Sequence, residues 1–382
     1  MSIDFEHYEG REPAFVKHTF LDKYLPSLIA KVSSRFDEFT YIDGFAGPWK
    51  SKAGETFGDT SFGIALNHMT ALRLNYLGRG RNVRMRAILV EKDPQAFSQL
   101  KDAIKRFPKV KVIAICGEFE SHIAQIQKAI SDRGFLFSLI DPKGFPDIEK
   151  LLPLLERPNS EALVNFMYDH ANRFAETGLI KHLEKWLAVS GLPNWEAELS
   201  GLSGLERERA IEALAVEGLR KKGAFRYAPV ITVDKSMHDR PLYKLIYLTR
   251  HSKGLEVFRT SEAKALEAQA QVRTNLKAKK REQLSGMADM FGNDFGSDRS
   301  AKLLEEGLAD ARTLMFEILG SAGSGGRTWE EVWPLVLDQV SVTKSKLGSL
   351  VNEARRAGRV VAPDWPSERH RQPSDRQLLV LS

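Results

Sequence analysis

The sequence of 382 residues contains only one cysteine, Cys116. This excludes an intrachain disulfide framework and any zinc cluster held by several cysteines, so no metal site is predicted. There is no apolar run of about 18 residues, so no transmembrane helix is predicted. The opening residues, MSIDFEHYEG, lack the basic and then apolar order of a secretion signal. These absences together predict a reducing, cytoplasmic setting.

Two familiar nucleotide-binding motifs are also missing. The pattern GxxxxGK[ST], which holds phosphates, does not occur, and the glycine loop YIDGFAGP does not match G-x-G-x-x-G. A ligand bound mainly through its phosphates is therefore less favoured than one recognised through a sugar and a base.

The positive charge is concentrated near the carboxyl terminus. The net charge is +6, and residues 341–376 hold eight lysines and arginines against four acids, a net +4. A basic terminal segment suggests a polyanion partner, and the alternative is an ordinary solvated basic surface.

Apolar strands alternate with amphipathic helices through the first half of the chain. The expected strands are 38–45, 84–93, 109–119, 134–146 and 161–170, and the expected helices are 14–36, 60–77, 94–107 and 120–131. Such alternation predicts an α/β fold with a doubly wound, Rossmann-like, seven-stranded sheet of the methyltransferase type. Residues 224–233 and 242–258 would add the last two strands as an edge hairpin, and 175–222 would be a helical insertion.

The amino-acid composition changes beyond residue 260. Residues 261–305 are polar and charged, which predicts a helical linker or a mobile segment. Residues 306–382 then show three helices followed by two short strands, 358–362 and 377–381. That order predicts a winged helix-turn-helix domain, with a plain helical bundle and a tail as the alternative. The expected domains are therefore 1–260 and 306–382.

Four of the predicted strands end in acidic or glycine-containing loops. The acids are Asp43, Glu91, Glu118 and Asp141. Because ligands of open α/β sheets bind beyond the carboxyl ends of the strands, these loops predict a ligand groove. The alternative is that each acid is simply an exposed strand end.

S-adenosylmethionine suits these residues. Glu91 is placed to accept both ribose hydroxyls, Glu118 and Phe119 would frame the adenine, and Asp43 would meet the ammonium and sulfonium. The glycine loop is also expected to bind the cofactor, because its two glycines and its alanine would let the ligand approach the backbone. The residues of this loop are Asp43, Gly44, Phe45, Ala46 and Gly47.

The stretch IDPKGF resembles the Asp/Asn-Pro-Pro-aromatic motif of amino methyltransferases that act on bases. Asp141 and Pro142 match, Lys143 replaces the second proline, and Phe145 arrives one residue late. We predict Asp141, Pro142 and Phe145 as the catalytic residues: the acid and the proline-adjacent carbonyl accept hydrogen bonds from an amino group, and the aromatic ring stacks on the base.

Several stretches together resemble the three-Cys-motif partner proteins, a family that is similar to class I S-adenosylmethionine-dependent methyltransferases. They are VKHTFLDKYLPSL, YIDGFAGPWKSKAGETFGDTSFGIAL, AILVEKDP, LIDPKGFP, LVNFMYDHANRF and YKLIYLTRHSKGLEVF. Two positions depart from the family pattern: Trp49 follows Pro48 in the glycine loop, and Lys143 takes the place of an aromatic residue.

The resemblance implies further roles. Lys17 and His18 would lie near the carboxylate of the cofactor, and Asn165, Asn172 and Arg173 would line the substrate side. It also implies a GMT-like winged helix-turn-helix domain at the carboxyl terminus and a partner protein, a radical S-adenosylmethionine enzyme with three cysteines.

The predicted function is therefore a methyltransferase that acts on nucleic acid, on a base amino group in the sharpest form of the hypothesis. The recognition helix would span Thr343 to Arg356. The residues expected to contact nucleic acid are Lys344, Lys346, Arg355, Arg356 and Arg359. Two alternatives remain: a non-catalytic regulatory protein that keeps the fold, and a nuclease whose metal is held by Asp43, Glu91 and Asp141.

Overall fold

The computed structural model of the chain describes residues 3–47, 51–142, 144, 146–168, 197, 199–285, 298–363, 365 and 369–382. The chain divides into two compact units, Met1–His251 and Ser252–Ser382, and each is described by itself. The division lies close to the boundary at residue 260 that the sequence predicts.

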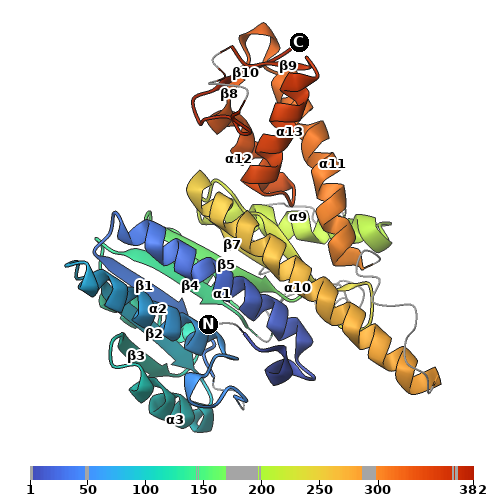
Figure 1. Ribbon diagram of the computed structural model, residues 1–382. Helices are drawn as coiled ribbons and strands as arrows, with labels where there is room; N and C mark the ends of the chain where they lie inside the picture. Colours follow the sequence, from blue (N-terminus) through green and yellow to red (C-terminus); the bar gives the residue numbers. More distant parts are fainter. Residues whose placement is uncertain are drawn as a thin grey trace. The chain divides into compact units, whose positions relative to one another are not determined.

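The first unit is built on a seven-stranded sheet with the order β3-β2-β1-β4-β5-β7-β6 (Figure 1). Its strands are β1 (Glu38–Asp43), β2 (Arg84–Glu91), β3 (Lys111–Cys116), β4 (Phe135–Ile140), β5 (Ser160–Phe166), β6 (Val230–Asp234) and β7 (Pro241–Leu248). The first five strands pair in parallel, and β7 runs antiparallel to both β5 and β6. The prediction of a mostly parallel, Rossmann-like α/β sheet is confirmed.

Helices cover both faces of this sheet. On one face lie α1 (Glu12–Ser33), α2 (Ser61–Gly78) and α3 (Pro94–Ala103), and on the other α4 (Ile123–Ala129), α5 (Ile148–Leu155) and α9 (Gly204–Lys222). Neighbouring residues of β4 show the two sides: Leu136 packs in the cluster with α4, α5 and α9, whereas the ring of Phe137 lies 5.5 Å from that of Tyr24 on α1. Because both faces are covered, the inner strands β1, β4 and β5 are buried at every position.

One strand boundary differs from the prediction. The strand expected over 242–258 ends at Leu248, and helix α10 (Ser252–Ser285) begins four residues later. The short apolar run GLEVF suggested a strand, but burial recurs at helical spacing, at Leu255, Phe258 and Glu262. Within the expected helical insertion, α9 is a helix, as predicted, and it lies on the same face of the sheet as α4 and α5.

The second unit contains α10, α11 (Arg299–Gly320), β8 (Arg327–Thr328), α12 (Trp329–Gln339), α13 (Lys344–Arg356), β9 (Val360–Val361) and β10 (Leu378–Leu381). The three short strands form an antiparallel sheet in the order β8-β10-β9. The three helices and two terminal strands expected from the sequence are present, together with the additional strand β8.

Helix α10 packs against α11 and α12, although its sequence reads as a charged linker. Its buried polar side chains are satisfied within the unit: Arg259 pairs with Glu262 at 2.7 Å, and Arg273 pairs with Asp298 at 2.8 Å. Charged side chains are buried mainly when they are paired. The ion pairs of α10 therefore allow a helix of polar composition to pack against its neighbours. No described helix in either unit is long and apolar enough to cross a membrane.

Candidate functional site

The switch point of the sheet lies between β1 and β4. From this pair the chain winds towards β2 and β3 on one side and towards β5 on the other. Ligands of open α/β sheets bind at this point, beyond the carboxyl ends of the strands. Asp43 ends β1, and Asp141 directly follows β4.

Asp141 is held by two side chains from different elements. Lys17 of α1 forms an ion pair with its Oδ2 atom, and the Nδ2 atom of Asn165 on β5 donates to its Oδ1 atom at 2.6 Å. The side chains of Lys17 and Asp141 are only 11% and 19% exposed. The structure brings Lys17, Asp141 and Asn165 into contact at the carboxyl edge of the sheet, and the sequence did not indicate these contacts.

The amide oxygen of Asn165 is a buried acceptor without a partner. Nδ2 must face Asp141, since the reverse orientation would set two oxygens against each other. Oδ1 then points elsewhere, and it meets no donor in the described part of the chain. A buried polar atom of this kind costs free energy unless a ligand or water satisfies it.

Asp43 differs because its own chain already satisfies it. Oδ2 accepts from Ser61 at 2.6 Å and from Tyr41 at 3.2 Å, and Oδ1 accepts from the backbone N–H of Phe45 at 3.1 Å. Burial raises the pKa of Asp43 to about 6, although the bonds from Ser61 and Phe45 act in the opposite direction. Because Asp43 is also fully buried, direct contact with a cofactor would require the side chains around it to move.

The glycine loop packs closely against other parts of the protein. A Cβ atom on Gly44 would lie 2.6 Å from the ring of Phe119, so only glycine fits beneath that ring. The amide N–H groups of Gly44 and Ala46 donate to the carbonyl oxygens of Leu139 and Val90. Gly47 forms no such bond with another described residue. Phe119 is buried and packs edge-on against Phe45, with ring centroids 5.9 Å apart.

Glu91 lies nearly buried at the end of β2, as predicted. One of its carboxylate oxygens, Oε1, accepts from the backbone N–H of Asp93 at 2.7 Å. The other has no described partner and is free to accept from a ligand. Glu118, in contrast, is exposed beside the first turn after β3.

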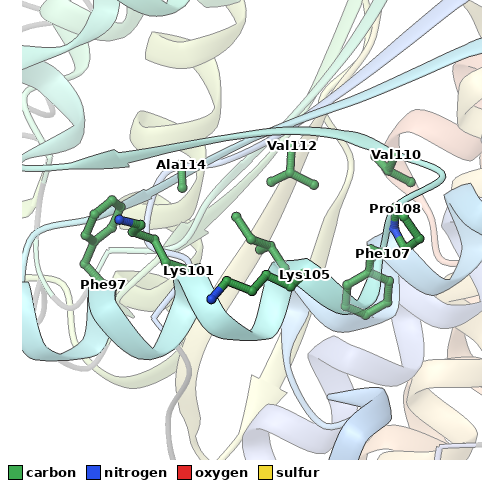
Figure 2. A pocket seen from close by; sticks show the side chains of 9 residues that line it. Phe97, Lys101, Lys105, Phe107, Pro108, Val110, Val112 and Ala114 are labelled. Carbon is green, nitrogen blue, oxygen red and sulfur yellow. The ribbon is translucent and has the colours of Figure 1, made fainter.

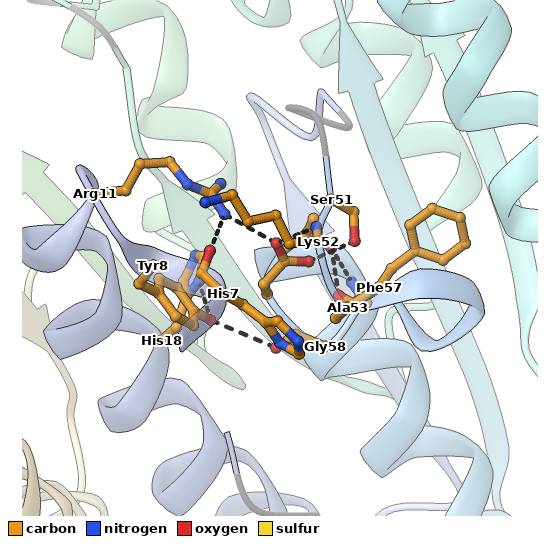
Figure 3. A network of polar contacts seen from close by, with 12 residues as sticks. His7, Tyr8, Arg11, His18, Ser51, Lys52, Ala53, Phe57 and Gly58 are labelled. Atoms are coloured by element: carbon orange, nitrogen blue, oxygen red, sulfur yellow. Dashed lines mark hydrogen bonds and ion pairs between the residues drawn. The ribbon is translucent and has the colours of Figure 1, made fainter. Parts of the chain in front are cut away.

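His18 on α1 faces the segment that precedes that helix (Figure 3). Its Nδ1 atom lies 2.9 Å from the hydroxyl of Tyr8, which also reaches the carbonyl oxygen of Gly58 at 3.5 Å. Burial, followed by the nearby charges of Lys17 and Arg11, lowers the pKa of His18 well below its usual range. His18 is therefore neutral at physiological pH.

Asp59 ties the loop after β1 to this same segment through Arg11, which Figure 3 shows beside Ser51 and Lys52 of the loop. It accepts from Arg11 at 2.9 Å, from Ser51 at 2.5 Å and from the backbone of Lys52 at 2.8 Å. Burial acts to raise the pKa of Asp59, but these bonds together lower it. Sequence reasoning missed Arg11 and Asp59, since neither stands in a recognisable motif.

Tyr243 of β7 is a further neighbour that the sequence did not indicate. Its hydroxyl donates to the carbonyl oxygen of Pro13 at 2.5 Å. Burial, and then the charge of Asp141, raises the pKa of Tyr243 well above its usual range.

Some predicted residues lie outside the described part of the chain. They are Pro48, Trp49, Lys143, Phe145, Asn172 and Arg173. Pro142 is described and is buried next to Asp141. The three acids proposed for a nuclease, Asp43, Glu91 and Asp141, do not form a group that could hold a metal, and no other such group occurs among the described residues.

The basic residues predicted to contact nucleic acid divide into engaged and free ones. Lys344 pairs with Asp375 at 2.7 Å and lies 4.3 Å from the centre of the Trp333 ring. Arg355 and Arg359 stack over Trp365 and Phe316. Lys346 and Arg356, on α13, are exposed and form no ion pair with a described residue.

The segment between β9 and β10 lies on the start of α13. Gln372 donates to the hydroxyl of Ser345 at 2.7 Å, and the side chain of Gln372 also packs on Gly348. The amino end of the expected recognition helix is therefore partly covered.

A cavity of about 510 Å³ lies away from this chemistry, beside the edge strand β3 (Figure 2). It is lined by side chains of α3, the turn that follows it, and β3. None of the predicted site residues lines it.

Comparison with known proteins adds little. No protein-family model matches the chain, and no curated protein matches it. Among solved structures it is similar to protein LPL1258 from Legionella pneumophila str. Philadelphia 1, described as family DUF519. The identity is 11% and the TM-score 0.33, over 62% of this chain and 85% of that one. Similarity at this level carries no argument about the site.

Proposed function

We propose that the first unit is an S-adenosylmethionine-dependent methyltransferase that acts on an amino group of nucleic acid. The observation that carries this proposal is the arrangement at the switch point: Asp141 lies between Lys17 and Asn165, and Asn165 keeps one buried acceptor open. The seven-stranded sheet with one reversed strand agrees with the fold that the family resemblance implies.

The residues at the neighbouring strand ends fit the cofactor in part. Glu91 has one free carboxylate oxygen for a ribose, and the partly exposed ring of Phe45, supported from beneath by the buried Phe119, offers apolar surface for an adenine. Lys17 suits the carboxylate of the cofactor, which would then share the lysine with Asp141. When bound, S-adenosylmethionine supplies a methyl group carried on a sulfonium.

The chain's own task is to hold and orient the acceptor. An exocyclic amine has two N–H donors, and Asp141 with the Oδ1 atom of Asn165 offers two acceptors for them. Hydrogen bonds of this kind favour the form of the amine whose lone pair is available for attack. Positioning and exclusion of water account for most of the catalysis expected at such a site.

We propose that the second unit is a winged helix-turn-helix domain that binds nucleic acid. The order α11, β8, α12, α13, β9, β10 with a three-stranded sheet supports this assignment. Lys346 and Arg356 are exposed cations of α13 that form no ion pair with a described residue, and they would contact phosphates. A base in a duplex would have to be flipped out to reach Asp141. A three-cysteine radical S-adenosylmethionine protein is proposed as partner on the resemblance alone.

Calorimetric titration with S-adenosylmethionine tests the cofactor assignment. We expect the wild type to bind, Glu91→Gln to lose most of its affinity, and the exposed surface variant Glu149→Gln to bind as the wild type does. No binding by the folded wild type would overturn the assignment. Transfer of a radiolabelled methyl group to total DNA and total RNA then tests the activity and identifies the substrate.

A regulatory protein without activity is the second candidate, because Lys17 already neutralises Asp141. The regulatory hypothesis predicts that the full chain binds S-adenosylmethionine but transfers no methyl group to DNA or RNA. The methyltransferase proposal predicts transfer that depends on Asp141.

A further inference from the structure

The cavity beside β3 is an apolar groove with a basic rim (Figure 2). Its walls include Val112 and Ala114 of β3 and Phe97, Ile104 and Phe107 from α3 and the turn that follows it. The lysines at its rim are Lys101 and Lys105, both exposed. Lysines at a sheet edge often serve only to prevent aggregation, but such a role does not account for an apolar groove between them.

The backbone of β3 is unpaired on the side away from β2. β3 is the last strand of the sheet, and among the described strands it pairs with β2 alone. No other backbone hydrogen bond involves residues 111–116 in the part of the chain that the structure describes. Unpaired N–H and C=O groups of this kind can accept another strand.

The groove has the spacing that an added strand requires. Val112, Ala114 and Cys116 alternate along β3 and therefore point to the same face, the one that faces α3. A neighbouring strand would direct every second side chain towards the same groove. Apolar residues at alternate positions would fit it.

The charge around the groove selects the occupant. Residues 101–111 hold five basic side chains and one acidic one, a net +4. Lys105 pairs with Asp102, and Arg106 pairs with Glu55, whereas Lys101, Lys109 and Lys111 have no described ion-pair partner. Pairing of β3 with β3 of a second copy would bring two such clusters together, so self-association is disfavoured.

We propose that this edge binds an extended acidic segment of another protein, with apolar residues at alternate positions, as an eighth strand beside β3. Main-chain hydrogen bonds would give affinity, the groove would select the apolar residues, and the lysines would select the acids. A nucleic acid strand would meet the lysines but would leave the groove and the backbone edge unused. The proposal is independent of the methyltransferase activity.

Fluorescence anisotropy with a labelled nonapeptide of alternating glutamate and valine tests the proposal. We expect saturable binding that Lys101→Glu with Lys105→Glu weakens by about tenfold or more. Ala114→Trp, which fills the groove, should weaken it as well. The matched control, Lys279→Glu with Lys280→Glu on exposed positions of α10, should leave the affinity unchanged.

Cys116 provides a second readout because it is the only cysteine, is exposed and ends β3. Bound peptide should slow its alkylation by a maleimide. Two further probes are a peptide of the same composition with the valines in one block, and a fifteen-nucleotide oligothymidylate. If either of them binds as well as the alternating peptide, the groove is only a cationic patch and the proposal fails. Binding that both groove variants leave unchanged, or no binding at all, would also overturn it.

Discussion

Asp43 and Asp141 end neighbouring strands of the same sheet and look equivalent in the sequence, but the structure treats them differently. Asp43 is fully buried, and three donors of its own chain satisfy both of its oxygens. Asp141 is partly exposed, and its partner Asn165 retains an unsatisfied oxygen. The difference teaches that an acid at a strand end can stabilise the turn or face a ligand, and that the unsatisfied acceptor beside it tells the two cases apart.

Replacing Asp141 is expected to have the largest effect on activity. Asp141→Ala should lower methyl transfer by about 1000-fold, the order seen when a group that stabilises a transition state is removed. The affinity for S-adenosylmethionine should change little. Radiolabelled transfer and calorimetry measure the two quantities, and Asp147→Ala, at the same end of the sheet, is the control. Full activity in Asp141→Ala would show that Asp141, like Asp43, has no role in catalysis.

Replacing Asp43 should instead change the pH dependence of stability. Because its pKa is raised to about 6 in the folded state, the folded protein holds this proton more tightly than the unfolded chain. Asp43 therefore stabilises the fold relatively less as the pH rises from about 4 to about 6, by roughly 3 kcal/mol in total.

Urea unfolding of the wild type and of Asp43→Asn at pH 4, 5, 6 and 7 measures this change. The stability of the variant relative to the wild type should rise across that window and then stay constant. A difference that does not depend on pH would show that burial of Asp43 does not shift its titration.

Asn165→Ala should sharpen the comparison, because it removes both the bond to Asp141 and the open acceptor. We expect methyl transfer to fall by about tenfold, the equivalent of one hydrogen bond. Asn165→Asp would restore an acceptor but place a second carboxylate beside Asp141, so it should not rescue activity. If Asn165→Ala lost stability but kept the wild-type rate, the residue would be purely structural.

The smallest expected effect is on nucleic acid binding by the second unit, where some cations of α13 have partners and others are exposed. Lys346→Ala with Arg356→Ala should weaken nucleic acid binding by roughly fivefold and lower its salt dependence by about two phosphate contacts. Lys344→Ala should leave the salt dependence nearly unchanged, because Asp375 and Trp333 already engage that lysine. Filter binding at several salt concentrations decides between these outcomes.

Strand ends were predictable because apolar runs followed by acids and glycines mark the edge of a parallel sheet. Partners at long range were not: Asn165 meets Asp141 only because β4 and β5 are neighbours. Gly44 was predicted to make room for a ligand, whereas in the structure it makes room for Phe119. The packed face of α10 escaped prediction because buried ion pairs resemble solvent-exposed charge in a sequence.

The bond between Arg11 and Asp59 has a practical consequence for anyone who shortens the protein. The turn before α1 serves as a clasp for the loop that follows β1. A version trimmed to begin at Glu12 would still contain every strand, but it would lose both Arg11 and Tyr8, the partners of Asp59 and His18. In measurements on such a version, the loop after β1 and the start of α1 would lack contacts that they have in the native protein.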